Sequence, residues 1–496
     1  MLPMSLKKTF YLKIFALLLM SGLFLGGKIC VAVAQTQQAE KELFLVAQKA
    51  FEDGFYDVSM RYIDQLFKEY PQTQKRVQAN LLLGQCYFFK TQYIKAYDVF
   101  QNLLQYNEFK DATIFWLGET YLKGADYKQA EKQYQQLIEV YPNSVYLPQA
   151  YYSLGWLHFE QGHLNESNEF FLKVMRDFPT HELAEDAAFK LAENQYNLKN
   201  YATAIQYFKN HILRYPQSTR QAQGYFYIGE SYFYLGDSLT AITYYAKAGE
   251  LSYDNKLSLM AKVSLGWSYL KLEKFNLAQQ YFDEALKFSK DKGMLSDDVY
   301  LGQATLYSEM KNYAQALDAY TQLIQNFPNS SRAIDAYLGK ANIYYILKNY
   351  PDAIKNYQNI LNEFAKTGKN ETAGRQEILE KASFGLAWSY LKSGNLDEAI
   401  KNFQAIKDSS PNNTVKISAL SQIGDAYQDA QQFEKAIQIY DTLLKDYSNS
   451  PYTDYIQYRQ GIALLKMGKI TRPRCRFKAF RRIFPITSIL RMSNII

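Results

Sequence analysis

Apolar and small residues recur every three or four positions in two successive segments between Asp111 and Pro142. The residues of this pattern are Ile114, Leu117, Gly118 and Tyr121 in the first segment, and Ala130, Tyr134, Leu137 and Tyr141 in the second. This spacing places each set on one face of an α-helix. Pro142 ends the second helix, because proline disfavours helical geometry in the residue before it. The pattern predicts a helical hairpin.

The same hairpin pattern recurs along the chain, most often every 37 residues. The predicted turns lie at Gly54, Thr91, Ala125, Gly162, Lys199, Gly236, Glu273, Lys311, Lys348, Gly394, Gln431 and Gly468, which we call the turn residues. Five positions after eleven of them stands a small residue: Ser59, Ala96, Ala130, Ser167, Ala204, Ala241, Ala278, Ala316, Ala353, Ala399 and Ala436. A period of this size is typical of stacked helical hairpins. Such a stack buries a continuous core although each unit contacts only its neighbours.

Two further features give the repeats a family resemblance. A Leu-Gly pair or its equivalent stands at 83–84, 117–118, 154–155, 228–229, 265–266 and 423–424, and a closing proline at positions 71, 142, 179, 216, 328 and 411. This pattern resembles the tetratricopeptide repeat and covers about Glu40 to Pro485. The resemblance implies an all-α fold, a right-handed α-solenoid of about twelve hairpins whose first helices line a concave groove. Most units are three residues longer than the family's standard repeat of 34, and the addition falls between hairpins.

The N-terminus has the anatomy of a secretory signal. Three lysines precede an apolar run from Ile14 to Gly27, and Ala32-Val33-Ala34 offers small residues at the cleavage positions. The run is too short to favour a membrane span, which needs about 20 residues. Cys30 raises the alternative of a lipid anchor, but Gly27-Lys28-Ile29 before it does not provide the small residue expected at that cleavage position. We therefore expect residues 1–34 to be removed, leaving an exported chain with no membrane span, most simply a periplasmic one.

The remaining chain is predicted to divide at one insertion. Residues 35–364 hold repeats one to nine, 365–379 an inserted polar loop or hinge, 380–485 repeats ten to twelve, and 486–496 a tail. After Ile470 the composition changes to arginine-rich, which fits either a frameshift or truncation, or a genuine final helix. Phe477, Phe480 and Phe484 keep the register of earlier repeats, so we favour the helix.

Charge and cysteine content exclude two classes. The formal charge is +7, but removing the signal and the segment from Thr471 onward leaves −4 for the body. A mildly acidic solenoid is a poor nucleic-acid binder, so no nucleic-acid partner is expected. Only Cys86 and Cys475 remain after cleavage, so no disulfide framework is predicted.

Candidate binding residues share one repeat position, six residues before the turn. Trp156, Trp267 and Trp388 occupy it in repeats four, seven and ten, and Glu119, Glu193, Glu230, Asn342 and Asp425 occupy it elsewhere. The resemblance places this position in the groove, where indoles provide large contact area. The alternative is that each Trp only packs against the next hairpin. A groove of this composition would suit a partner with apolar and basic residues.

No residue cluster indicates chemistry. No nucleophile-base motif, phosphate-binding loop or Cys/His ligand spacing is present, so no enzyme activity, cofactor or metal is predicted. His158 and His211 fill positions where other repeats have Tyr and Leu, which favours packing over metal binding.

Together these features predict an exported, non-catalytic scaffold that binds another envelope protein or a peptide segment. With the signal, the extended repeats resemble bacterial envelope repeat proteins such as those associated with the Tol-Pal system or the outer-membrane barrel-assembly machine. The alternatives are a protein associated with glycan or peptidoglycan, and a regulatory subunit of an envelope enzyme.

Overall fold

The computed structural model describes residues 38–367 and 373–468, and every regular element in these ranges is a helix. This confirms the all-α prediction. The described residues divide into two compact units, one ending at Leu235 and the other beginning at Gly236. The predicted signal, the second helix of repeat twelve and the tail lie outside the described residues.

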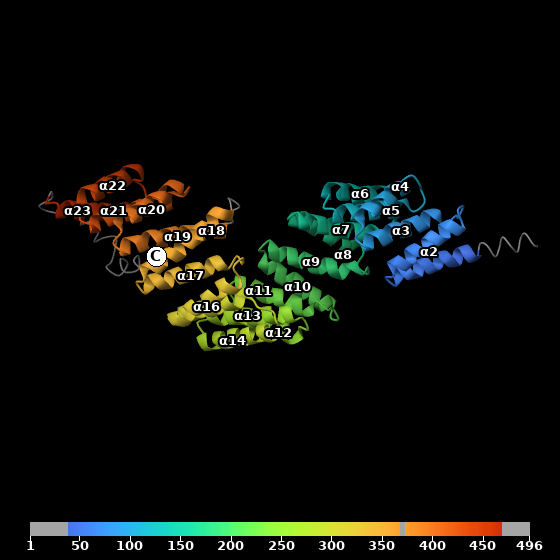
Figure 1. The fold of residues 1–496 in the computed structure, drawn as a ribbon, viewed down its shortest axis with the longest axis horizontal. Helices are drawn as coiled ribbons and strands as arrows, with labels where there is room; N and C mark the ends of the chain where they lie inside the picture. Colours follow the sequence, from blue (N-terminus) through green and yellow to red (C-terminus); the bar gives the residue numbers. More distant parts are fainter. Residues whose placement is uncertain (1–37, 368–372, 469–496) are drawn as a thin grey trace, which may run out of the picture. The chain divides into compact units, whose positions relative to one another are not determined.

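The first unit is a series of antiparallel helices joined by short turns (Figure 1). A helix over residues 38–52 is followed by α2 (Tyr56–Glu69), α3 (Arg76–Phe89), α4 (Tyr93–Leu103), α5 (Lys110–Lys123), α6 (Tyr127–Val140), α7 (Leu147–Glu160), α8 (Leu164–Asp177), α9 (Leu183–Asn197), α10 (Tyr201–Arg214) and α11 (Gln221–Tyr234).

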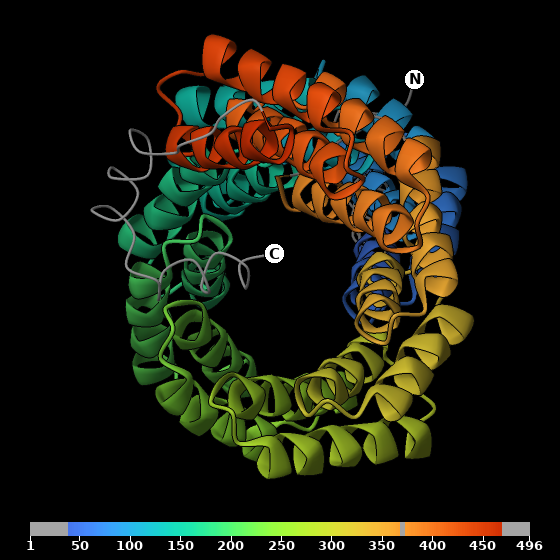
Figure 2. The ribbon, with the colours of Figure 1, turned by 90° about the vertical axis from the view of Figure 1, so that its left-hand side faces the viewer.

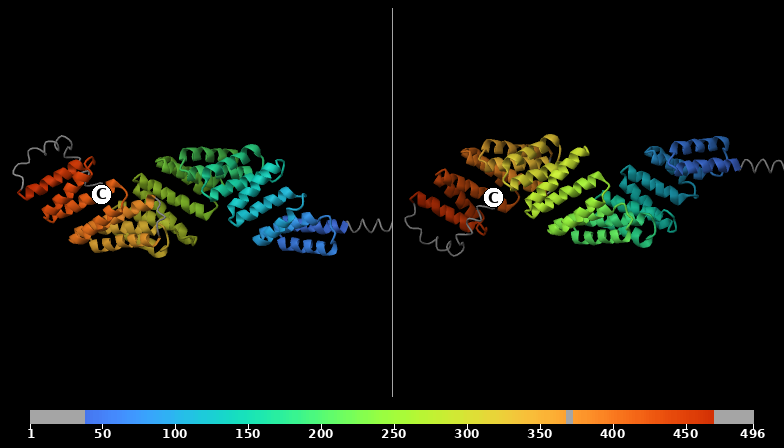
Figure 3. Two further views of the ribbon diagram at one scale, coloured as in Figure 1. Left: turned by 90° about the horizontal axis from the view of Figure 1, so that it is seen from above. Right: turned by 90° about the horizontal axis from the view of Figure 1, so that it is seen from below.

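The second unit continues the same alternation (Figure 3). It contains α12 (Ser238–Leu251), α13 (Asn255–Lys271), α14 (Phe275–Asp291), α15 (Asp297–Glu309), α16 (Tyr313–Asn326), α17 (Ala333–Ile346), α18 (Tyr350–Thr367), α19 (Ala373–Lys392), α20 (Leu396–Ser409), α21 (Asn413–Asp429), α22 (Phe433–Asp446) and α23 (Thr453–Lys466).

The prediction of a polar loop or hinge at 365–379 is wrong for most of its length. Residues 365–367 belong to α18 and residues 373–379 belong to α19, and residues 368–372 lie outside the described residues. Helix α19 begins earlier than predicted because apolar residues at helical spacing follow the polar segment. Ile378 and Leu379 of α19 pack against the core around Tyr357 and Ile360.

The hairpins of each unit form two layers. First helices touch the first helices of neighbouring hairpins, as in α3 with α5 and α15 with α17, whereas the described second helices contact mainly the helices adjacent to them in the chain. The first helices therefore lie closer together, and each unit curves with its first helices on the inner side. Figure 2 shows the inner and outer layers.

The core depends on the small residues that the repeat pattern identified. All eleven positions five residues after the turn are fully buried. Nine residues after the turn stands a buried ring in every described hairpin except the first, which has Ile63. One such ring is Phe282 of α14, which covers Gly266 of its own hairpin and Gly302 of the next. A Cβ at Gly266 would lie 2.7 Å from this ring. Glycine in the first helix thus makes room for an aromatic ring rather than for a second backbone.

The additional residues of each repeat form a braced connection between hairpins. In the connection between α6 and α7, Ser144 Oγ donates a hydrogen bond to Asp111 Oδ2 at 2.7 Å and accepts one from the Tyr146 backbone N–H at 3.2 Å. Thr73 and Ser330 make the equivalent bonds to Glu40 and Asp297. In these three connections the serine or threonine therefore ties the connection to the start of the preceding first helix.

Candidate functional site

The eight predicted binding residues all lie on first helices, on the inner side of their unit. They are Glu119 on α5, Trp156 on α7, Glu193 on α9, Glu230 on α11, Trp267 on α13, Asn342 on α17, Trp388 on α19 and Asp425 on α21. Where the contacts of this position extend beyond its own hairpin, they reach a neighbouring first helix, which is the next one for Glu119, Glu193 and Asp425 and the preceding one for Glu230. Trp156 belongs to the first unit, and Trp267 and Trp388 belong to the second.

Glu119 is held inside the inner layer by two hydroxyl groups. Tyr134 OH of the same hairpin donates to Glu119 Oε1 at 2.7 Å, and Ser153 Oγ of α7 donates to the same oxygen. Burial raises the pKa of the Glu119 carboxyl above its usual value, while these two donors oppose the rise. This carboxyl links two hairpins and does not project toward a partner.

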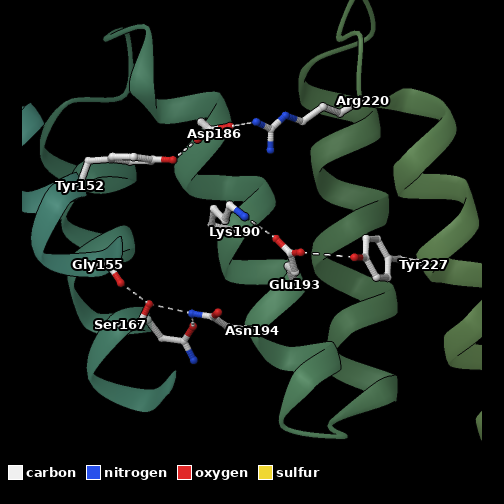
Figure 4. A network of polar contacts seen from close by, with 10 residues as sticks. Tyr152, Gly155, Ser167, Asp186, Lys190, Glu193, Asn194, Arg220 and Tyr227 are labelled. Carbon is white, nitrogen blue, oxygen red and sulfur yellow. Dashed lines mark hydrogen bonds and ion pairs between the residues drawn. The ribbon is translucent and has the colours of Figure 1, made fainter. Parts of the chain in front are cut away.

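Glu193 and Glu230 also accept hydrogen bonds from neighbouring helices. Lys190 Nζ lies 2.8 Å from Glu193 Oε2, and Tyr227 OH donates to Glu193 Oε1 at 3.3 Å, as Figure 4 shows. Tyr196 OH donates to Glu230 Oε2 at 3.2 Å. The charge of Glu193 is therefore compensated within the chain.

Asp425 has the most extensive set of contacts. It accepts hydrogen bonds from Tyr440 OH and Tyr455 OH at 2.6 Å each and from Arg459 Nε at 2.7 Å. Burial and the nearby carboxylate raise the pKa of Tyr440 well above its usual value, so this phenol stays protonated and donating. The three donors come from α22 and α23 and hold Asp425 in place.

Asn342 differs from the carboxylates because its side chain is exposed at the surface. Its Oδ1 accepts a hydrogen bond from Tyr357 OH at 2.7 Å. The amide nitrogen remains as a possible donor toward a bound segment. In the acidic groove expected from the sequence, the charges of Glu193 and Asp425 are thus compensated by Lys190 and Arg459, and Glu119 is hydrogen-bonded to two hydroxyl groups.

Each of the three indoles is partly buried. Trp267 packs edge-on against Phe282 with ring centroids 5.6 Å apart and contacts the core clusters of two successive hairpins. Trp388 packs edge-on against Phe403 at 6.3 Å, and its buried Nε1 has no hydrogen-bond partner. Each indole therefore packs within the solenoid, and part of its surface remains accessible.

Trp156 carries a cation on its ring. Lys190 Nζ of α9 lies 4.8 Å from the Trp156 ring centroid and 5.2 Å from that of Phe159, while also pairing with Glu193. A partly buried lysine in this position orders the indole and covers part of its face. Lys190 therefore reduces the part of the Trp156 ring that a partner could contact.

The sequence also contains a correlation that the prediction did not use, between the residue six before the turn and the residue nine after it. Where the residue six before the turn accepts a hydrogen bond from its own hairpin, the residue nine after the turn is tyrosine, as in Tyr134, Tyr357 and Tyr440. Where it is tryptophan, that residue is phenylalanine: Phe171, Phe282 and Phe403. A buried hydroxyl requires an acceptor, whereas an indole provides only apolar surface there. Glu193 is the exception. The residue nine after its turn is Phe208, which has no hydroxyl group, and Glu193 accepts hydrogen bonds from Lys190 and Tyr227 instead.

A second polar network ties α7 to α11 (Figure 4). Asp186 accepts a hydrogen bond from Tyr152 OH and pairs with Arg220. Deeper in the layer, buried Asn194 donates from Nδ2 to Ser167 Oγ at 2.9 Å and to Asn168 Oδ1 at 2.9 Å. These hydrogen bonds join neighbouring hairpins, although Asn194 Oδ1 is buried without a hydrogen-bond partner.

The histidines occupy packing positions. His158 stacks on Phe170 with centroids 5.3 Å apart, and His211 is almost fully buried beside Phe189. Burial lowers the pKa of His211. Among residues 38–367 and 373–468, no three His, Cys, Asp or Glu side chains gather as metal ligands would.

Sequence comparison identifies the repeats. Two models of the tetratricopeptide repeat match the chain, one at residues 112–144, 186–218, 298–330, 381–413 and 418–450, and the other at 148–176 and 261–292. A search of the curated proteins found no match.

Solved structures of repeat proteins are similar at low sequence identity. A tetratricopeptide repeat protein from Parabacteroides merdae is 17% identical, covers 54% of this chain and 96% of its own, and has a TM-score of 0.40. The C-terminal part of a repeat protein from Cytophaga hutchinsonii is 17% identical, with 52% and 98% coverage and a TM-score of 0.43. MamA is 21% identical, with 37% and 93% coverage and a TM-score of 0.32.

Proposed function

We propose that the chain, seven segments of which match models of the tetratricopeptide repeat, is a non-catalytic scaffold that binds a segment of a partner protein along the inner side of its first helices. The observation that carries the proposal is the recurrence of Trp156, Trp267 and Trp388 at one repeat position, each supported by the solenoid and each partly accessible. A preformed aromatic surface binds at low entropic cost, because the indoles are already ordered.

The internal pairing of the carboxylates restricts the chemistry that we expect of the partner. Glu119, Glu193 and Asp425 already accept hydrogen bonds from neighbouring helices, so a basic partner would have to displace these donors. Apolar side chains, and backbone groups that reach exposed amides such as Asn342, suit the surface better. We expect the affinity to change little between low and moderate salt, because few free charges contribute to it.

The experiment uses the two indoles of the second unit. Trp388→Phe and Trp267→Phe keep a ring against Phe403 and Phe282 but remove the accessible part of the indole, and Leu277→Ala on the outer layer is the control. After co-purification from the host identifies the partner, its affinity is measured for each variant by calorimetry, alongside thermal unfolding. We expect weaker binding by the Trp variants, nearly unchanged melting, and no effect of Leu277→Ala. Undiminished binding by both Trp variants would contradict the proposal.

The proposed location is the bacterial cell envelope, after export by the signal at residues 1–34. The support is the run of lysines, apolar residues and small residues that ends at Ala34. In the exported protein the first residue should be Gln35. N-terminal sequencing of protein from the native host checks this, and a retained apolar run or a lipid on Cys30 would refute it. In the described residues, no helix combines the length and apolar character that crossing a membrane requires.

A further inference from the structure

A side chain of the next hairpin lies against the residue six before the turn at several places on the inner side. In each case this side chain stands nine positions before its own turn. The pairs are Ser153 with Glu119, Lys190 with Trp156, Tyr227 with Glu193 and Arg459 with Asp425. The residue nine before the turn therefore covers part of the inner surface of the preceding hairpin.

In three successive hairpins of the second unit this covering position holds glycine, namely Gly302, Gly339 and Gly385. In the other described hairpins that follow another hairpin, it holds Leu82, Trp116, Ser153, Lys190, Tyr227, Ser264, Gln422 and Arg459. Rings of the preceding second helices fill the space beside these glycines. A Cβ would lie 2.2 Å from Phe282 at Gly302 and 2.3 Å from Tyr357 at Gly385. A covering side chain therefore has no room at these positions.

The residues paired with these glycines are Trp267 on α13, Thr305 on α15 and Asn342 on α17, which we call the open strip. Trp267 packs against apolar residues of the next hairpin. Thr305 Oγ1 donates to Leu301 O of its own helix at 2.8 Å, and Asn342 Oδ1 accepts from Tyr357 of its own hairpin. Asn342 is exposed, and its Nδ2 donates to no acceptor in the described part of the chain.

The open strip is uncharged, and the charges of its helices are balanced. α13, α15 and α17 together carry four lysines and four acids, namely Lys256, Lys262, Lys271, Lys340, Asp297, Asp298, Glu309 and Asp335. Charge thus favours neither an acidic nor a basic partner. A helical partner satisfies its own backbone groups and needs several apolar anchors, whereas an extended segment presents free C=O and N–H groups. One indole followed by a hydroxyl and an amide suits the extended segment.

We propose, on the basis of the scaffold function above, that the partner segment binds in an extended conformation across the open strip. An apolar side chain of the segment lies on Trp267, and one of its carbonyl groups accepts a hydrogen bond from Asn342 Nδ2. Neighbouring helices pack about 10 Å apart, so the strip is about 20 Å long. About six extended residues span this length. Trp156 contributes little, because Lys190 already covers part of its ring.

The first experiment uses a phage-displayed library of random nine-residue peptides, selected on the full chain and counter-selected on an unrelated protein. The affinity of the enriched peptides is then measured by fluorescence anisotropy for the wild type, Trp267→Phe and Trp156→Phe. The two variants are matched, because each keeps a ring at the same repeat position. Thermal unfolding checks that both are folded.

We expect Trp267→Phe to weaken binding at least about tenfold and Trp156→Phe to weaken it less than about threefold. Equal weakening by the two variants would overturn the assignment to the open strip but leave the scaffold function standing. No weakening by either variant, or no enriched peptide, would contradict both proposals. Enrichment of strongly acidic or strongly basic peptides would also count against the open strip.

A second pair of variants tests the amide of Asn342. Asn342→Asp keeps the oxygen that accepts from Tyr357 OH but removes the Nδ2 donor, so it should weaken peptide binding about tenfold. The control is Glu119→Gln, the reverse exchange at the same repeat position, whose carboxyl is held by Tyr134 and Ser153. It should not change the affinity. Unchanged binding by Asn342→Asp, or an equal loss in both variants, would show that the segment does not cross α17 as proposed.

Discussion

At the residue scale, the tight turn of every hairpin uses a left-handed backbone conformation. All twelve turn residues have positive φ, and seven of them are not glycine. Non-glycine residues in this region are strained because Cβ approaches the backbone, at a cost of about 1 kcal/mol or more. The turn geometry is therefore imposed by helix packing on both sides, which exceeds the local cost.

Glu273 is the residue at which this strain is most easily relieved. Its φ is 57°, and its carboxylate follows the C-terminus of α13, where the helix dipole disfavours negative charge. We expect Glu273→Gly to raise the free energy of unfolding by about 0.5–1 kcal/mol. Chemical denaturation measures the change. The converse substitution, Gly394→Ala at a turn with φ of 87°, should lower it. Destabilisation by Glu273→Gly would contradict this account.

His211 should make stability depend on pH. Its side chain is buried, neither ring nitrogen has a hydrogen-bond partner, and burial lowers its pKa, with Glu185 Oε1 at 3.8 Å and Asp186 opposing the shift and Arg220 adding to it. Below about pH 6.5 the unfolded state binds a proton that the folded state does not, so stability falls by up to about 1.4 kcal/mol per pH unit until the folded pKa is reached.

The test is His211→Leu, because leucine fills the equivalent positions Leu103 and Leu137. The variant should melt at a higher temperature than the wild type, and the difference should grow as the pH is lowered from neutral. His163→Leu, at the exposed start of α8, is the control. A difference in melting temperature that does not change with pH would show that His211 does not titrate in this way.

At the element scale, hairpins are held together by rings placed on glycines. Phe282 lies over Gly266 and Gly302, and Tyr440 lies over Gly424. Each ring comes from a second helix and fills the space that a glycine leaves on a first helix. The same geometry provides a test of the last hairpin.

Gly461 of α23 stands at the position of Gly266 and Gly424, and no described atom lies within 4 Å of a Cβ built on it. The sequence predicts a final helix, outside the described residues, that would place Phe477 over Gly461. If so, Gly461→Ala should cost about 1–3 kcal/mol, as Gly302→Ala should against Phe282. If no ring covers this position, alanine should instead stabilise α23 by about 0.5–1 kcal/mol. Thermal unfolding of both variants distinguishes the outcomes.

At the scale of the whole molecule, the described residues form a succession of contacts between neighbouring hairpins and share no single central core. Its hydrophobic clusters each involve at most three successive hairpins, and stability in such a molecule is approximately a sum of local contributions. Loss of core packing in one hairpin should therefore destabilise that hairpin and its neighbours but not the distant hairpins.

Phe403→Ala and Phe100→Ala test this expectation. Both side chains are fully buried in second helices, one in each unit, and removing each should cost about 3–5 kcal/mol. Hydrogen exchange should increase in α19–α21 for Phe403→Ala and in α3–α5 for Phe100→Ala. The other region serves as the control in each case. Faster exchange throughout the chain in either variant would show global cooperativity instead.

The sequence by itself determined the repeat and its register. Turn positions, buried small residues and the placement of the candidate residues on first helices follow from periodicity, because helical packing demands small side chains at fixed spacing. His211 could likewise be assigned to the core from its position among leucines. The polar segment near Lys366 misled the prediction, since composition indicated a loop where Ile378 and Leu379 extend the helix by packing.

Only the tertiary structure decided what the groove residues do. The sequence placed Glu119, Glu193 and Asp425 on a common face, but each of them also accepts hydrogen bonds from another helix of the hairpin or from the next hairpin. The indoles likewise proved to be packed on Phe282 and Phe403 while remaining partly accessible. Periodicity along one helix fixes which face a side chain occupies. Whether that side chain is free or already paired depends on contacts between helices, which the spacing within a single repeat does not contain.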